Sequence, residues 1–526
     1  MTNDLVTVPA WLAARTQQDP AAHLVTFGDT WVSVGEVLRR ARELATGLFR
    51  SGIRPGDRIA SIMTNRVEAV ELFFACAELG AIQVPLNVFL KGEFLRYQLL
   101  DAGPRAIVAD GSAIGALDGL LDTADLREAT LIALDEPVAD AVACGDLFGE
   151  EDQTWPEPKP TDLSCILYTS GTTGLPKGCM IDSGYLVHMP KAHRMHEWFK
   201  QGDTSLCPLP LYHGFAISAL MDAVVIGCRV AFDAEFSASA TLSRARQLGA
   251  TQFFGVGAMA VALLATPASP DDKDHTIDRA VFVPVAPRAQ HEFEARFGCL
   301  VFCEGYGQTE VLPATMGVTR TRRDKPSAGK AVPWLDVQVV DDDDNVLPVG
   351  DVGEIVVRPL EPHSMFAGYW RKEADTVAAW RNLRHHTGDL GYFDEDGTLY
   401  FVDRKKDALR RRGENVSSVE VELAIAKHPA VAQVAVHAVP AELSEDEIKA
   451  CIVLQPGAQP TWPELFQHFR DVLPYYAVPR YVEYVDQLPA NAVGRVQKHK
   501  LREEWNTGAT VDFRQIGLVI DRSSRR

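Results

Sequence analysis

The sequence lacks any apolar run long enough to cross a bilayer, which would take roughly 20 predominantly apolar residues. Its first residues, Met1 to Leu5, show no basic segment followed by an apolar core, the pattern of a secretory signal. It also lacks internal repeats and low-complexity tracts. We therefore expect a globular protein that has no membrane span and works in the cytoplasm.

Positive charge is scarce. The chain carries 52 Lys and Arg residues against 71 Asp and Glu residues, which gives a formal net charge of −19 at pH 7. This balance argues against nucleic acid or an anionic membrane as a partner of the bulk surface. An anionic small molecule would have to be held by a local cluster of donors and cations.

Paired cysteines are also missing. The nine cysteines are scattered, none forms a CxxC pair, and Cys299 with Cys303 has no second pair at metal-binding spacing. We expect free, buried thiols in a reducing compartment. The rest of the composition, 46% hydrophobic and 23% charged, is typical of globular proteins, and 526 residues are too many for one typical domain.

Strand-like and helix-like segments alternate over the first half of the chain, which is typical of α/β folds with parallel sheets. Helical spacing is clearest from Val34 to Leu48 and from Val67 to Gly80, where a glycine ends the pattern. Strands are expected at 58–62, 81–86, 106–109, 130–133, 165–168, 223–232, 251–256 and 280–285.

The second half of the chain changes character twice. Short strands and turns from Ala331 to Arg358 predict a small β-barrel-like unit, in which the acidic run Asp341–Asp344 is interpreted as a solvated turn. Beyond Asp407 the pattern is that of a small α+β unit, with helices at 418–427 and 461–472 and strands at 431–438, 449–455 and 480–485. We predict a large N-terminal domain over 1–404 and a small C-terminal domain over 405–526.

The stretch from Tyr168 to Gly178 reads Tyr-Thr-Ser-Gly-Thr-Thr-Gly-Leu-Pro-Lys-Gly. Glycines let the backbone turn its N–H groups toward an anion, hydroxyls add donors, and lysine adds a mobile positive charge. A Walker A loop is a poor interpretation, because two residues separate Gly174 from Lys177. We predict a polyphosphate cradle formed by Thr169, Ser170, Gly171, Thr172, Thr173, Gly174 and Lys177.

Two further runs carry isolated carboxylates. The run Glu304-Gly305-Tyr306-Gly307-Gln308-Thr309-Glu310 follows an apolar strand, and its carboxylate, glycines and hydroxyl suit a site for Mg²⁺ and phosphate. Asp389 is the only acid in Thr387–Gly391, just before a predicted hairpin over 391–402. Because a carboxylate can accept hydrogen bonds from both ribose hydroxyls, Asp389 is a ribose-binding candidate, together with Arg404.

With these runs in this order, the sequence resembles the adenylate-forming superfamily, which includes acyl-CoA synthetases, aryl-CoA ligases, luciferases and peptide-synthetase adenylation domains. The resemblance extends from about residue 10 to residue 505. It implies that a carboxylate attacks the α-phosphorus of Mg·ATP, releasing pyrophosphate and leaving an acyl adenylate, and that CoA then displaces AMP. ATP, Mg²⁺ and CoA are the implied cofactors, a small-molecule acid is the implied partner, and the chain is compatible with a homodimer.

The resemblance also assigns roles to individual residues. Thr309 matches a threonine that contacts the α-phosphate, Glu310 matches a glutamate that reaches Mg²⁺, and Tyr306 matches a tyrosine that packs on adenine. Lys406 matches a hinge about which the C-terminal domain rotates, and residues 413–420 match a segment beside the pantetheine tunnel. The implied catalytic residues are Thr169, Lys177, His213, Glu310, Arg495 and Lys498, and the nucleotide-binding set adds Ala286, Glu304, Tyr306, Gly307, Thr309, Asp389 and Arg404.

The acid pocket implied by the resemblance is a mixed apolar set without an obvious counter-charge for an amino acid. His213, in Pro210-Leu211-Tyr212-His213-Gly214-Phe215, matches a residue near the carboxylate and the tunnel mouth. The implied pocket positions are His213, Phe215, Gly255, Gly257, Met259, Cys303 and Leu312.

The sequence departs from the family pattern in two places. Arg495 stands where the family has a lysine that bridges the carboxylate and the α-phosphate, and arginine is bulkier than a compact ammonium. Losing one optimised contact to developing charge typically costs ~10²–10³ in rate. Either Arg495 replaces the lysine, Lys498 or Lys500 takes its place, or the first half-reaction differs. The second departure is Val283 to Arg288, where Arg288 replaces a small-residue pattern and is interpreted as a surface residue.

An acyl- or aryl-CoA ligase is the first hypothesis. Because of Arg495, two other uses of adenylation stay open: acyl transfer to a carrier protein, and activation of nitrite for diazotisation of an aryl amine. A hypothesis of another class is an ATP-binding regulatory protein without catalysis. The phosphate run, Glu310 and Asp389 count against it.

Overall fold

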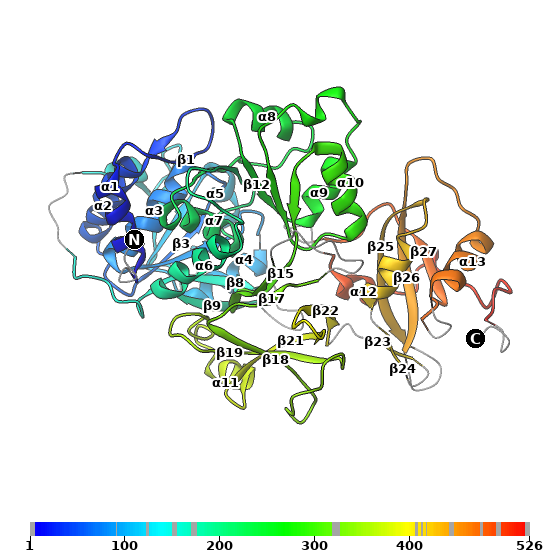
Figure 1. Ribbon diagram of the computed structural model, residues 1–526. Helices are drawn as coiled ribbons and strands as arrows, with labels where there is room; N and C mark the ends of the chain where they lie inside the picture. The colour runs from blue at the N-terminus through cyan, green and yellow to red at the C-terminus, as the bar shows by residue number, and fades with distance from the viewer. Residues whose placement is uncertain are drawn as a thin grey trace. The chain divides into compact units, whose positions relative to one another are not determined.

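The computed structural model describes residues 6–90, 92–121, 126–149, 155–169, 176–317, 327–405, 409–411, 414–416, 418–440, 446–473, 477–490 and 496–520 (Figure 1). The chain separates by contacts into two compact units, residues 1–337 with 357–385 and residues 338–356 with 386–526. The domain boundary after Arg404 stays a prediction.

The first unit contains two seven-stranded sheets. One has the strand order β7-β6-β5-β3-β4-β8-β9, parallel throughout except for the antiparallel pair β8 and β9. Its strands are β3 (Arg58–Ile62), β4 (Ile82–Leu86), β5 (Ala106–Ala109), β6 (Thr130–Ala133), β7 (Val142–Ala143), β8 (Leu163–Thr169) and β9 (Lys177–Asp182).

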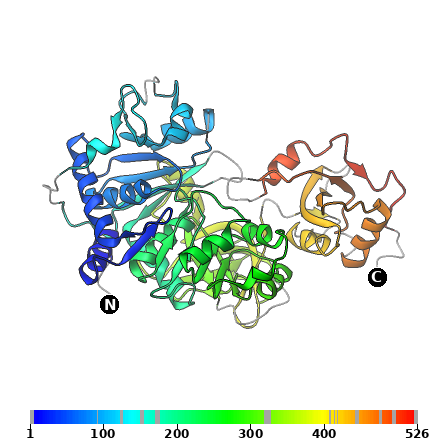
Figure 2. The same cartoon turned by 90° about the horizontal axis from the view of Figure 1, so that it is seen from above.

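Helices cover both faces of this sheet (Figures 1 and 2). Leu99 of α4 (Gly92–Ala102) and Leu117 of α5 (Gly111–Leu117) belong to the same buried cluster as Ile107. Leu44 of α2 (Val34–Arg50) and Leu72 of α3 (Val67–Leu79) instead meet Val108, the next residue of the same strand. Because successive strand side chains point to opposite faces, the two pairs of helices lie on opposite sides of the sheet.

The second sheet has the order β14-β13-β12-β10-β11-β1-β2, and only the pair β1 and β2 is antiparallel. Its strands are β1 (His23–Thr26), β2 (Val32–Ser33), β10 (Thr204–Leu206), β11 (Arg229–Ala231), β12 (Gln252–Gly255), β13 (Arg279–Phe282) and β14 (Leu300–Phe302). Helices α8 (Thr241–Leu248), α9 (Gly257–Leu264) and α10 (Pro287–Phe297) contribute buried residues to one apolar cluster with this sheet. The remaining helical segments of this unit are α1 (Val8–Gln18), α6 (Ser183–Met195), α7 (Gly214–Val225), η1 (Cys144–Leu147) and η2 (Pro270–Lys273).

Smaller sheets follow. A three-stranded sheet consists of β15 (Gly305–Gln308), β16 (Val311–Met316) and β17 (Lys330–Ala331). The segment predicted to be barrel-like contributes to a five-stranded sheet in the order β18-β19-β21-β20, with β22 paired to β21. Its elements, with one short helix, are β18 (Leu335–Val340), β19 (Gly353–Pro359), α11 (Glu373–Ala379), β20 (Trp380–Arg381), β21 (Arg384–Phe393) and β22 (Leu399–Arg404). As predicted, Asp341 lies in an exposed turn, where it accepts hydrogen bonds from the backbone of Asp343 and Asn345.

The C-terminal part of the second unit is the predicted α+β arrangement. A four-stranded sheet, β25-β26-β27-β28, packs against helices through buried residues such as Ile425, Phe469 and Val482. Helix α13 begins with a capping box formed by Thr461 and Glu464. The elements are β23 (Leu409–Arg411), β24 (Glu414–Val416), α12 (Ser418–Ile425), β25 (Val431–Pro440), β26 (Asp446–Leu454), α13 (Trp462–Val472), β27 (Tyr481–Tyr484), α14 (Lys498–Glu503) and β28 (Val511–Asp512).

Most of the predicted elements are confirmed, including β5 and β6 at the predicted residues and the left-handed Gly80 that ends α3. The strand predicted at 223–232 is wrong, because α7 runs to Val225 and β11 begins only at Arg229. A short, continuous apolar run does not separate a buried helix end from a buried strand. All nine cysteines are free, as expected. Among the described residues, no helix is long and apolar enough to cross a membrane.

Candidate functional site

The two stems of the predicted phosphate cradle are adjacent strands. Thr169 ends β8, Lys177 begins β9, and the two residues are paired in the antiparallel register. The Thr169 hydroxyl lies 3.4 Å from the Lys177 carbonyl oxygen and donates to it. The predicted cradle residues Ser170, Gly171, Thr172, Thr173 and Gly174 lie outside the described residues.

The ammonium group of Lys177 has two neighbours from a segment far along the chain. Its Nζ lies 3.0 Å from a carboxylate oxygen of Asp375, on α11, and 5.0 Å from the centre of the Tyr369 ring. The ion pair is partly exposed, with 37% of the lysine side chain and 44% of the aspartate side chain accessible. A pair this exposed contributes little stability, so a phosphate group could displace Asp375 at small cost.

Thr309 and Glu310 form the turn between β15 and β16, because Gln308 pairs with Val311 across the hairpin. The buried Tyr185 of α6 supports this turn: its hydroxyl donates to the carbonyl of Thr309 at 3.3 Å and accepts from the backbone N–H of Leu312. The hydroxyl of Tyr185 therefore holds the turn that carries the predicted phosphate contact and the predicted metal ligand.

Glu310 is buried, and one of its carboxylate oxygens accepts a hydrogen bond from the Tyr369 hydroxyl at 2.7 Å. The nearby thiol of Cys179 is fully buried; desolvation and the Glu310 carboxylate raise its pKa well above the ordinary value, which keeps it protonated. Sequence reasoning missed both Tyr369 and Tyr185. Tyr369 is 59 residues from Glu310 in the chain, and a local sequence pattern cannot predict a contact between residues so far apart.

Glu304 and Glu310, at the two ends of their run, are both buried. Glu304 is 7% exposed, and its carboxylate accepts a hydrogen bond from the Ser327 hydroxyl. A Cβ atom at Gly317 would lie 2.1 Å from the other carboxylate oxygen, so glycine is required there. Glycine is also needed at position 307, where a Cβ would lie 2.7 Å from the Val311 carbonyl oxygen. Nucleotide contacts of Glu304, Tyr306 and Gly307 stay predictions.

Four of the predicted acid-pocket residues lie at one edge of the second sheet: Gly255, Gly257, Met259 and Cys303. Strands β12, β13 and β14 are parallel and in register, with Gly255 opposite Phe282 and Val281 opposite Phe302. The residues that follow these strands, which include Met259, Ala286 and Cys303, therefore emerge at the same carboxyl edge, where open α/β sheets bind ligands. Burial raises the pKa of the Cys303 thiol to about 12, so it is a neutral wall residue.

Close packing shapes this edge. A Cβ on Gly257 would lie 1.7 Å from the carbonyl oxygen of Pro284, so only glycine allows α9 to begin so near the following loop. Phe215 of α7 packs on the other face of this sheet, with its ring centre 4.3 Å from that of Phe254 on β12. Arg288 is an exposed surface residue paired with Glu292 at 2.7 Å, as predicted.

His213 caps the start of α7 and has an exposed side chain. Desolvation by the surrounding protein nevertheless lowers its pKa, which favours the neutral imidazole. A neutral ring can donate and accept one hydrogen bond each and brings no positive charge toward a carboxylate. Its role at the carboxylate stays a prediction, as does that of Leu312.

In the second unit, Asp389 and Arg404 face each other on β21 and β22. Asp389 is 4% exposed, and the Nε of Arg404 lies 3.6 Å from one of its carboxylate oxygens, which is too long for a hydrogen bond. That Nε is buried and has no hydrogen-bond partner among the residues that the structure describes. A buried guanidinium donor without a partner fits a site that a polar ligand completes.

Lys498 already has partners in this structure. Its ammonium donates to the hydroxyl of Ser418 at 2.5 Å and lies 2.8 Å from a carboxylate oxygen of Glu422. Ser418 in turn donates to Asp403 through both its backbone N–H and its hydroxyl. This chain of contacts attaches α14 to α12 and to the end of β22, so Lys498 would have to leave an ion pair to act in catalysis. Arg495 and Lys406 lie outside the described residues.

Glu310 could hold a magnesium ion only together with the phosphate groups of bound ATP. In the part of the chain that the structure describes, no three His, Cys, Asp or Glu side chains gather as a metal site. Mg²⁺ is usually bound by one or two carboxylates together with substrate phosphates. The isolated carboxylate of Glu310 fits that pattern.

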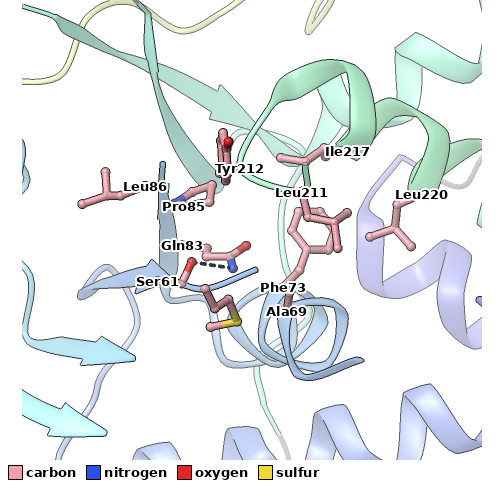
Figure 3. Close-up of a pocket in the computed structure, with 11 residues that line it drawn as sticks. Ser61, Ala69, Phe73, Gln83, Pro85, Leu86, Leu211, Tyr212, Ile217 and Leu220 are labelled. Carbon is pink, nitrogen blue, oxygen red and sulfur yellow. Dashed lines mark hydrogen bonds between the residues drawn. The ribbon is translucent and has the colours of Figure 1, made fainter. Parts of the chain in front are cut away.

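A small pocket lies between β3, β4, α3 and the start of α7 (Figure 3). The side-chain amide of Gln83 donates to the Ser61 hydroxyl at 3.1 Å within it, and both groups are buried. Gln83 and Ser61 are hydrogen-bonded to each other, and most of the other residues that line the pocket are apolar. We therefore interpret the pocket as a small packing defect of the core. It contains none of the predicted site residues.

Comparisons with known proteins agree with this geometry. The family model for AMP-binding enzymes matches residues 11–370, and the model for the C-terminal domain of AMP-binding enzymes matches residues 420–495. The chain is 31% identical over 502 residues to a feruloyl-CoA synthase of Amycolatopsis sp, covering 94% of this chain and 98% of the relative. It is 30% identical over 486 residues to a crotonobetaine/carnitine–CoA ligase of Citrobacter koseri, covering 90% and 93%. Among solved structures, ATP-bound MatB from Rhodopseudomonas palustris superimposes with a TM-score of 0.85 at 28% identity, covering 94% and 98%.

Proposed function

Since this chain belongs to the family of AMP-binding enzymes, we propose that it is specific for an aryl carboxylic acid without a charged amine. It is an AMP-forming ligase that converts an acid and ATP to an acyl adenylate and pyrophosphate and then forms a CoA thioester. The proposal concerns the substrate class and the residues that act on it.

The observation that carries the substrate class is the make-up of the carboxyl edge of β12–β14. Met259 and Cys303 bring sulfur-containing side chains to it, and Phe215 contributes an aromatic ring from the other face of the sheet. Among the predicted pocket residues there is no acidic side chain to pair with an ammonium group. Aromatic rings pack favourably against other rings and against sulfur. An uncharged ring on the acid is the best match, and the relative that is a feruloyl-CoA synthase supports this choice.

The nucleotide end of the proposal rests on separate contacts in each unit. ATP supplies the α-phosphorus that the acid attacks. Lys177 is placed to exchange Asp375 for a phosphate, and Glu310 offers a carboxylate for Mg²⁺. Asp389 can accept from ribose hydroxyls, and Arg404 has a buried donor for a ribose oxygen. Positioning and charge neutralisation are the enzyme's contribution to such a displacement.

Three further predictions, on the metal ion, the cellular compartment and the oligomeric state, belong to this proposal. We propose that the enzyme uses Mg²⁺, works in the cytoplasm and forms a homodimer. These points follow from the resemblance and the composition, and each has a direct measurement: metal dependence, fractionation and molar mass in solution.

The proposed function is tested by measuring AMP and pyrophosphate release against a panel of aryl, alkyl and amino acids, with and without CoA. We expect aryl acids and CoA together to give the fastest AMP release and a thioester product. Release with aryl acid but no thioester would indicate another acceptor, such as a carrier protein. Release that requires nitrite and an aryl amine, or ATP binding without any release, would reject the CoA ligase.

Changing Arg404 to Met should weaken ATP binding without affecting the acid. Hydrogen bonds to charged groups contribute about 1.5–3 kcal/mol, so the dissociation constant for ATP should rise about 10- to 100-fold. Titration calorimetry measures it directly. Arg288→Met is the matched control, because Arg288 is an exposed arginine whose ion pair is with Glu292 on its own helix. Equal affinity in the Arg404 and Arg288 variants would show that Arg404 does not contact the nucleotide.

A further inference from the structure

Tyr369 stands where three segments of the first unit meet. Its backbone is fixed alongside β9, because the N–H of Met180 donates to the Gly368 carbonyl at 2.9 Å and the N–H of Trp370 donates to the Gly178 carbonyl at 2.8 Å. Its own N–H donates to the hydroxyl of Thr376 at 2.9 Å. These bonds on both sides leave the backbone of Tyr369 little freedom, so the direction of its side chain is set by the strand next to it.

The hydroxyl of Tyr369 donates to Glu310 at 2.7 Å, and both side chains are 8% exposed. A protonated phenol beside a carboxylate can only donate to it. The hydrogen bond therefore holds one oxygen of Glu310 and directs the other away from Tyr369.

The ring of Tyr369 makes the second contact. The Lys177 ammonium lies 5.0 Å from the ring centre, within the range of a cation–π interaction. The lysine side chain is long and would otherwise sample many rotamers. The ring and Asp375 together restrict it, and when a phosphate displaces Asp375 the ring remains. One side chain thus touches both the predicted phosphate lysine and the predicted metal carboxylate.

We propose that Tyr369 is a positioning residue for adenylation, which orients Glu310 toward Mg²⁺ through its hydroxyl and holds Lys177 for phosphate through its ring. The inference rests on the proposed function for the roles of Glu310 and Lys177. Groups that orient a metal ligand typically change metal affinity or activity 10- to 100-fold when removed. The two parts of the side chain should therefore affect two different measurements.

The test compares Tyr369→Phe, which removes only the hydroxyl, with Tyr369→Leu, which also removes the ring. Calorimetry gives the dissociation constant of ATP for each protein, once with excess Mg²⁺ and once with EDTA. The matched control is Tyr484→Phe, which removes another partly buried hydroxyl, one that donates to the Pro460 carbonyl at 3.0 Å in the second unit. Thermal unfolding checks that all variants are folded.

For Tyr369→Phe we expect the affinity for ATP with Mg²⁺ to fall about 10- to 100-fold and the affinity in EDTA to stay within about twofold of the unchanged protein. Tyr369→Leu should in addition lose about two- to fivefold in EDTA, the effect of a partly exposed cation–π contact. Equal losses for Tyr369→Phe with and without Mg²⁺, or a loss no larger than that of Tyr484→Phe, would overturn the inference. A protein that binds Mg·ATP in this pattern but releases no AMP with any acid would reject the proposed function and still support the role of Tyr369.

Discussion

Glu310→Gln should reduce the rate of AMP formation about 10²–10³-fold, the typical cost of removing one group that stabilises charge at a reacting centre. Glutamine has nearly the same shape, and its amide oxygen can still accept the hydrogen bond from Tyr369, so the turn between β15 and β16 should keep its structure. What is lost is the negative charge that would bind Mg²⁺ beside the phosphates. The initial rate of pyrophosphate release at saturating ATP and acid measures the effect.

The control for this prediction is Glu292→Gln, which removes an exposed carboxylate that pairs with Arg288. Its rate should equal that of the unchanged protein. Raising the Mg²⁺ concentration should recover part of the activity of Glu310→Gln, because a weakened site fills again by mass action. A rate within about threefold of the unchanged enzyme would show that Glu310 is no metal ligand, since this lies well below the loss expected for such a group.

Asp222→Ala should lower the free energy of unfolding of the first unit by about 1–3 kcal/mol, the usual cost of leaving a buried polar group without its hydrogen-bond partner. Asp222 on α7 is fully buried, and its carboxylate lies 2.8 Å from Nδ1 of His193 on α6, whose side chain is 2% exposed. The imidazole ring stacks on Trp198 and Phe199 and meets the edge of Phe254. Without Asp222, a polar ring would remain between aromatic side chains with its Nδ1 partner gone. Urea denaturation followed by tryptophan fluorescence measures the change.

A second variant separates the loss of the pair from the loss of packing. Replacing both residues, with His193→Phe and Asp222→Leu, removes the polar groups together, and such replacements of buried pairs by apolar residues are often neutral. We expect the double variant to recover most of the stability that Asp222→Ala loses. If the double variant is as unstable as the single one, the volume and shape of the two side chains, and not their pairing, stabilise this part of the core.

The sequence was sufficient for elements whose cause is local. The apolar periodicity of α2 and the glycine that ends α3 are visible in short windows, and the structure has them at the predicted places. The alternation of strands and helices also predicted the parallel sheets. The end of α7 was missed because a short apolar run has the same pattern in a buried helix as in a buried strand.

The candidate site divides in the same way. Lys177, Glu310 and Asp389 stand in runs whose residue types announce phosphate, metal or ribose chemistry. Tyr185 and Tyr369 do not, because a tyrosine within an ordinary apolar segment carries no sign of the carboxylate or turn that it will meet. The pairing of Lys498 with Glu422 was equally hidden, since it depends on how α14 packs against α12. Local sequence patterns could not predict these contacts between distant segments of the chain.

The close approach at Gly257 has a consequence for protein engineering. The main-chain oxygen of Pro284 occupies the space where a side chain at position 257 would begin, so variation at 257 would shift the backbone before it changed any substrate preference. Met259 and Cys303 are partly buried and end in flexible or small groups, which neighbouring side chains can accommodate when they change. Because Met259 and Cys303 are predicted acid-pocket positions, a library intended to broaden the range of acids should vary these two positions and keep the glycine.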